Sequence, residues 1–96
     1  MYSSPHNPTS NIFTKEELLK IIELCKKYHV TILSDEIWCD LCYKPFTSIL
    51  SLATENVVSF FSTSKTFNCA GLNMAITVCK DKKLIEIFKK EQFTNW

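Results

Sequence analysis

VVSFFSTSK, residues 57–65, is the stretch that decides the fold of this 96-residue chain. Its first half, Val57 to Phe61, predicts a short buried strand, and its polar second half ends at Lys65. Val30 to Leu33 forms a similar apolar run, typical of a strand with helices over both sheet faces, and Asp35 follows it closely. The two runs predict one α/β piece with polar groups at the strand ends.

Helices and loops are expected around these strands. Thr14 and Glu17 match a capping box, which predicts a helix from residue 14 to about residue 29. The spacing of its apolar residues predicts an inward face made of Leu18, Ile21, Ile22, Cys25 and Tyr28. We expect a loop over residues 1–13, a loop with a short turn of helix or strand over 38–49, a third strand over 74–79, and a helix over 82–93 with Leu84, Ile85 and Phe88 inward.

Composition favours a globular chain of the cytosol. Hydrophobic residues make up 46% and charged residues 22% of the chain, close to globular averages. The net charge of +1 gives no argument for binding nucleic acid or an anionic membrane, and no apolar run is long enough to span a bilayer. Five cysteines, an odd number, and the lack of a signal-peptide pattern favour the reducing cytoplasm. We therefore expect small molecules or protein as partners.

Chemistry-bearing side chains meet at one sheet edge if the two strands run parallel, and ligands bind at that edge in α/β folds. Pyridoxal phosphate needs a lysine amine, an anion near its pyridine nitrogen, phosphate donors and a polar partner for its ring hydroxyl. Those roles suit, in that order, Lys65, Asp35, Ser62 with Ser64, and Asn7. Taken alone, a lysine after a strand is more often a solvated surface residue, and a carboxylate there is more often a cap.

Three motifs occur in a set order along the chain: PHNPT at residues 5–9, SDEI at 34–37 and STSKTFNCAGL at 62–72. They resemble the fold-type I pyridoxal-phosphate enzymes, in the cystathionine beta-lyase branch of the aminotransferase class I/II group. The resemblance implies a mostly parallel sheet and a homodimeric full-length enzyme whose small-molecule substrate is a sulfur-containing amino acid. It also implies that residues 1–96 are a central part of the large cofactor-binding domain, with no second domain.

The resemblance further implies roles for individual residues. Lys65 would bind the cofactor covalently and then act as the base, and Asp35 would pair with the pyridine nitrogen. Asn7 would bond the ring hydroxyl, while Ser62 and Ser64 would hold the phosphate.

Two further positions bear on the cofactor and the reaction. Where the family commonly has a tyrosine or histidine that contacts the ring hydroxyl, this chain has Trp38, whose indole donates one hydrogen bond. Asn73 stands where many aminotransferases carry a phosphate-binding arginine, which the lyase branch often lacks. The first hypothesis is therefore a carbon–sulfur lyase, with an aminotransferase as the alternative.

Two hypotheses from other classes stay open. The chain by itself could be a catalytically inactive fragment, because the family's upstream phosphate-binding loop and its C-terminal small domain have no counterpart here. Cys39 and Cys42 form a C-x-x-C pair, but no second pair or histidine follows at metal spacing. We expect no metal at this pair.

Overall fold

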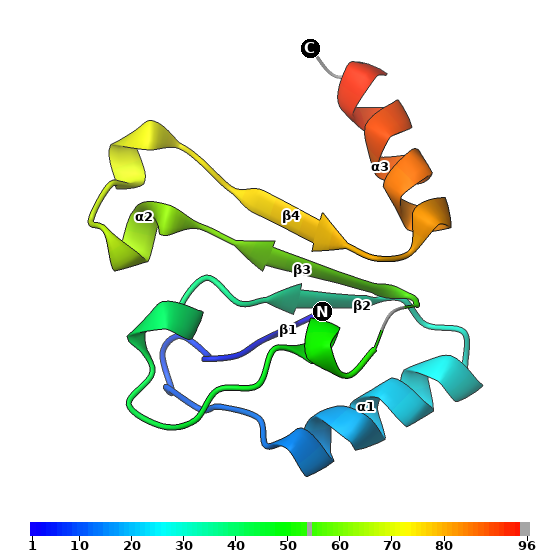
Figure 1. Ribbon diagram of the computed structural model, residues 1–96, viewed down its shortest axis with the longest axis horizontal. Coiled ribbons are helices and arrows are strands. Elements are labelled where there is room, and N and C mark those ends of the chain that lie inside the picture. Colours follow the sequence, from blue (N-terminus) through cyan, green and yellow to red (C-terminus); the bar gives the residue numbers. More distant parts are fainter. Residues whose placement is uncertain (54, 95–96) are drawn as a thin grey trace.

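The computed structural model of this chain describes residues 1–53 and 55–94. Four strands form one sheet in the order β1-β2-β3-β4 (Figure 1). β2 lies parallel to both β1 and β3, whereas β4 is antiparallel to β3. The strand bounds are Tyr2–Ser3 (β1), Ile32–Asp35 (β2), Val57–Phe61 (β3) and Ile76–Cys79 (β4). The predicted α/β class is confirmed.

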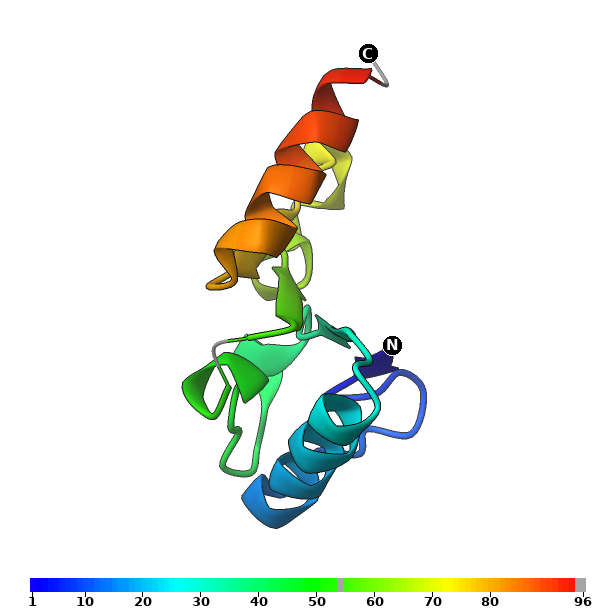
Figure 2. The same ribbon diagram turned by 90° about the vertical axis from the view of Figure 1, so that its right-hand side faces the viewer.

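Helices and short 3-10 turns occupy distinct places around this sheet. They are α1 (Lys15–Lys27), η1 (Cys39–Leu41), η2 (Ile49–Ser51), α2 (Thr63–Thr66), η3 (Ala70–Leu72) and α3 (Lys82–Thr94). α1 runs below the strands, and α3 rises away from them beyond the end of β4 (Figures 1 and 2). No helix in the described part of the chain is long and apolar enough to cross a membrane.

The start of α1 follows the predicted capping box. The Thr14 hydroxyl accepts a hydrogen bond from the Glu17 amide at 3.2 Å, and the Glu17 carboxylate accepts one from the Thr14 amide at 2.8 Å. Leu18 is completely buried, and three other predicted inward residues pack against the core: Ile21, Ile22 and Cys25. The prediction for Tyr28 was wrong, because this residue is the C-cap of the helix and is 65% exposed.

β2 begins two residues later than predicted. His29 has a positive φ of 54°, and the Val30 amide donates a hydrogen bond of 2.8 Å back to the Cys25 carbonyl. The chain therefore uses residues 30–31 to turn out of α1, and the strand runs on to include Asp35. The expectation of two covered faces was also wrong here, since Ile32 and Ser34 are buried but the alternate residues are only partly so.

Three other expectations need correction. The loop predicted for residues 1–13 contains β1, which forms by pairing of Tyr2 and Ser3 with β2, a contact distant in sequence. The strand predicted from residue 74 starts at Ile76, since Asn73 turns the chain in a left-handed conformation with φ 47°. Phe88, predicted to face inward, is 41% exposed because α3 leaves the sheet. The short helical turn expected within residues 38–49 is confirmed as η1.

The core lies between α1, η2 and one face of β2 and β3. It is formed by buried apolar side chains from these elements: Leu18, Ile32, Ile49, Leu50 and Val57. The contribution of η2 was not predicted, because two apolar residues in an irregular segment carry no periodic signal. α1 and η2 therefore both pack against one face of β2 and β3, the two strands that end at the predicted site.

Truncating the core residue of α1 should destabilise the chain strongly. Leu18→Ala removes a fully buried side chain and should lower the free energy of unfolding by about 2–5 kcal/mol. Leu24→Ala on the same helix, at a position 56% exposed, is the matched control and should change the free energy far less. Urea denaturation followed by circular dichroism measures both, and equal losses would contradict the assigned core.

Asp81 should make stability depend on acid pH. Its Oδ2 accepts a hydrogen bond from the Asn56 amide, and its Oδ1 accepts bonds from the amides of Lys83 and Leu84. These bonds, the one from Asn56 first, lower the pKa of Asp81 below its usual 3.8. A lowered folded-state pKa stabilises the fold above the unfolded value, and this stabilisation is lost as the pH falls through the folded-state pKa.

Asp81→Asn should therefore flatten the loss of stability below pH 4 relative to the unmodified chain. Urea midpoints measured from pH 2.5 to pH 6 test this expectation. Glu23→Gln, at an exposed position of α1, is the control and should leave the slope of the acid limb unchanged. Identical acid limbs for the chain and Asp81→Asn would contradict the assignment.

Candidate functional site

The parallel pairing of β2 and β3 brings their carboxyl ends to one edge of the sheet. Ser34 lies opposite Ser59 and Asp35 opposite Phe60 in this register. η1 follows β2 and α2 follows β3 at this edge (Figure 1). The predicted parallel arrangement, which places Asp35 and the turn from Ser62 at the same edge, is confirmed.

The hydroxyl groups after β3 are held close together. Ser62 is the N-cap of α2, and its Oγ accepts a hydrogen bond from the Ser64 amide at 3.1 Å. The same Oγ lies 2.9 Å from Ser64 Oγ and 2.7 Å from the carbonyl oxygen of Met74, to which it can donate. The turn that carries Lys65 is therefore shaped by the two serines predicted to hold phosphate.

Lys65 lies over an aromatic ring from the other strand end. Its Nζ is 5.4 Å from the centroid of the Trp38 ring, within the range of a cation–π contact. Lys65 is exposed and forms no ion pair with any described residue. A second contact joins the same two segments, because Thr66 Oγ1 donates a hydrogen bond of 2.9 Å to Asp40 Oδ2. Trp38 thus orients the Lys65 amine, but no carboxylate among the described residues neutralises its charge.

Asp35 presents a partly buried carboxylate at the end of β2. Its Oδ1 accepts a hydrogen bond from the Ile37 amide at 3.1 Å, which orients the side chain within its own turn. No other hydrogen bond to this carboxylate appears among residues 1–53 and 55–94. Asp35 can therefore accept a further, charge-assisted bond from a ligand.

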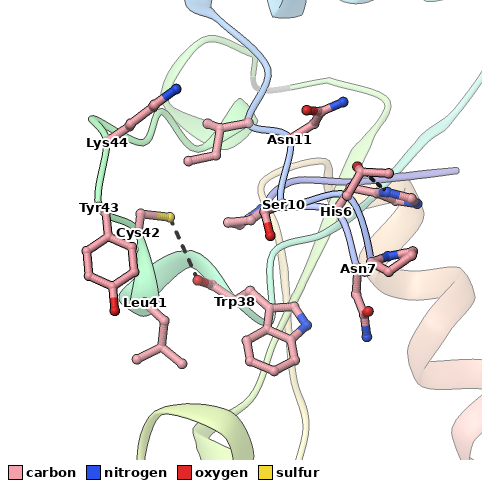
Figure 3. A pocket seen from close by; sticks show the side chains of 13 residues that line it. His6, Asn7, Ser10, Asn11, Trp38, Leu41, Cys42, Tyr43 and Lys44 are labelled. Atoms are coloured by element: carbon pink, nitrogen blue, oxygen red, sulfur yellow. Dashed lines mark hydrogen bonds between the residues drawn. The ribbon is translucent and has the colours of Figure 1, made fainter.

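An open pocket of about 620 Å³ adjoins this edge. It lies between the loop of residues 5–12 and the segment that starts at Trp38 and ends at Lys44. Asn7 and Trp38 extend in the same direction from these two segments (Figure 3). These two predicted site residues line the pocket, whereas the other four lie outside its lining: Asp35, Ser62, Ser64 and Lys65.

Comparison with known proteins identifies the family. The family model described as aminotransferase class I and II matches residues 1–93. The chain belongs to this family. It is 38% identical over 84 residues to cystathionine beta-lyase PatB of Bacillus subtilis, covering 82% of this chain and 22% of that protein. A putative aminotransferase of the same species, YugH, is 44% identical over 71 residues, covering 71% of this chain and 18% of that protein.

A solved structure shares the fold of this aminotransferase class I and II chain. Cystalysin from Treponema denticola, whose crystal structure contains a pyridoxal 5'-phosphate cofactor, superposes with a TM-score of 0.90 at 33% identity. The alignment covers 97% of this chain and 25% of cystalysin. The chain therefore spans about a quarter of the length of this solved relative.

Sequence reasoning missed Glu36 as a structural centre of this sheet edge. Glu36 is 1% exposed, and its Oε1 accepts hydrogen bonds from three parts of the chain. The signal was available, because strand alternation puts Glu36 on the same buried face as Ser34. The backbone also explains an asparagine at position 73. Asn73 has a left-handed conformation, which asparagine tolerates better than most residues.

The C-x-x-C pair, Cys39 and Cys42, lies in the segment that follows β2, and the pKa values of both thiols are raised. Burial, followed by the nearby charge of Asp40, raises the pKa of Cys39 to about 11 and raises the pKa of Cys42 in the same direction. The five cysteines are all free thiols. Within the described ranges, no group of three or more histidine, cysteine, aspartate or glutamate side chains could hold a metal ion.

Because of its raised pKa, we expect Cys39 to react slowly with iodoacetamide near pH 8. Its labelling rate should keep rising towards pH 11, since the thiolate is the nucleophile. Asp40→Asn removes the charge that stabilises the protonated thiol and should shift this rate profile to lower pH. Peptide mapping by mass spectrometry after timed alkylation separates Cys39 from Cys42. A profile that levels off near pH 8.5, as for an ordinary cysteine, would contradict the assignment.

Proposed function

We propose that this chain contributes the lysine and the aspartate of a pyridoxal 5'-phosphate site in a carbon–sulfur lyase acting on a sulfur-containing amino acid. The observation that carries the proposal is the Lys65 amine, which lies over Trp38 and forms no ion pair with a described residue, at the same sheet edge as Asp35. Family membership supports the cofactor, and the likeness to a cystathionine beta-lyase supports the reaction.

The side chains present fit the cofactor by residue type. When bound, pyridoxal phosphate supplies an electron sink for the charge left at the substrate Cα. Asp35 has an oxygen available to hold the proton on the pyridine nitrogen through a charge-assisted bond. We assign Asn7 to the ring hydroxyl, Trp38 to a wall of the cofactor site, and Ser62 and Ser64 to the phosphate.

Lys65 does two jobs in this proposal. Its Nζ would hold the cofactor covalently and so anchor it to α2. With its amine free, Lys65 would be the base that takes the proton from the substrate Cα. The bond between Cβ and sulfur then breaks, the sulfur leaves as a thiolate, and hydrolysis yields ammonia and a keto acid. The aromatic face of Trp38 holds the protonated amine near this edge before the cofactor binds.

An aminotransferase is the second candidate, because YugH, named a putative aminotransferase, is 44% identical to this chain over 71 residues. In that case Lys65 would carry the proton in an amino-transfer reaction, and no thiolate would leave the substrate. For either reaction, we propose that residues 1–96 form part of the large cofactor-binding domain of a homodimeric enzyme. The near-complete match to a quarter of cystalysin supports this placement.

Borohydride trapping tests the anchor directly. Purified chain mixed with pyridoxal phosphate and reduced with borohydride should carry a pyridoxyl group on Lys65, located by peptide mass spectrometry. Lys65→Ala should lose this label, while Lys20→Ala, which alters an exposed lysine of α1 outside the pocket, should keep it. Asp35→Asn should weaken cofactor affinity by about tenfold or more, because it removes a charge-assisted bond.

The products identify the reaction. Incubation with cystathionine should release pyruvate and a thiol if the protein is a lyase, and amino transfer that depends on an added keto acid would support the second candidate instead. A labelled Lys65 with neither product would support the hypothesis of a catalytically inactive fragment. No label on Lys65 would overturn the proposal for this chain.

A further inference from the structure

We propose that Glu36 is the positioning residue of this site, holding Asp35 and Trp38 in place from the buried face of the sheet. This inference rests on the proposed function, because it assigns Glu36 to the same cofactor site. Glu36 touches no ligand in this assignment and acts only through its neighbours. The proposal rests on the hydrogen bonds of the Glu36 carboxylate and of the Glu36 backbone.

One oxygen of Glu36 joins three segments. Its Oε1 accepts hydrogen bonds from Ser34 Oγ of β2 at 3.0 Å, from Ser59 Oγ of β3 at 3.2 Å and from the amide of Ile49 in η2 at 3.3 Å. Ser34 also lies opposite Tyr2 of β1 in the parallel register of the sheet. The carboxylate therefore connects the parallel strand pair to the core turn beneath it.

The backbone of Glu36 is fixed at the same time. Its amide donates a hydrogen bond of 2.9 Å to the Phe60 carbonyl of β3, and its carbonyl accepts one of 3.0 Å from the Cys39 amide. Asp35 precedes this clamped residue, and Trp38 is the N-cap residue of η1, which begins at Cys39. A shift of Glu36 would therefore move the carboxylate of Asp35 and the ring under Lys65 together.

The second oxygen argues for more than a packing role. Oε2 of Glu36 is buried and has no hydrogen-bond partner among the described residues. A buried polar atom without a partner is costly, so its presence asks for an explanation beyond packing. We assign this group to orienting its neighbours, which are two predicted cofactor contacts, Asp35 and Trp38.

A double-mutant cycle with Asp35 separates positioning from stability. Pyridoxal phosphate is titrated by visible absorbance into the full chain and into Glu36→Gln, Asp35→Asn and the double variant, at a temperature where circular dichroism shows all four folded. Glu36→Gln places amide N–H groups where no described acceptor lies, so it should weaken affinity about tenfold. If Glu36 acts through Asp35, the double variant should bind no more weakly than Asp35→Asn alone.

Several outcomes would overturn this role. Multiplying effects in the double variant, or unchanged affinity of Glu36→Gln, would make Glu36 a structural residue only. Glu16→Gln, at an exposed position of α1, is the control and should bind as the unaltered chain does. Failure of borohydride to label Lys65 in the unaltered chain would instead overturn the proposed function as well, so the two failures are distinguishable.

A second variant keeps the test open if Glu36→Gln does not fold. Ser59→Ala removes one of the three donors and leaves the carboxylate in place. It should weaken cofactor affinity two- to fivefold, on the order of one hydrogen bond, and the effect should vanish in the Asp35→Asn background. An effect that persists in that background would contradict the positioning role.

Discussion

The parallel pairing of β2 with β3 is the constraint on which the rest of this structure depends. It directs both chain segments out of the sheet at one edge, so that Asp35 and the turn carrying Lys65 arrive there from strands separated by 21 residues of sequence. An antiparallel pairing would send the two groups to opposite edges. β4 does run antiparallel, and it brings Met74 back to the same edge, where its carbonyl meets Ser62.

The two faces of β2 have different roles, one in the core and the other at the candidate site. Ile32, Ser34 and Glu36 follow one another on the buried face, where η2 and α1 pack. Asp35 lies on the opposite face, and its carboxylate is bonded only within its own turn among the described residues. Alternation along one strand thus separates a carboxylate available to a ligand from a carboxylate that holds the framework.

Much of the fold followed from local sequence. The capping box marked the start of α1, and the apolar run before Ser62 marked β3 at the observed bounds. The predicted bounds were wrong where contacts between residues distant in sequence determine the structure. β1 depends on pairing with β2, and the start of β2 depends on how the chain turns at His29. The exposure of Phe88 depends on the direction in which α3 leaves β4, which helical periodicity does not specify.

For the site, sequence by itself determined the residue types, their order and the family, because motifs are properties of the linear chain. Only the tertiary structure decided which of these residues meet. It placed Lys65 over Trp38, tied Thr66 to Asp40 and buried Glu36 under three donors from separate segments. The physical reason is that such contacts depend on strand register and turn geometry, which arise when segments distant in sequence pack together.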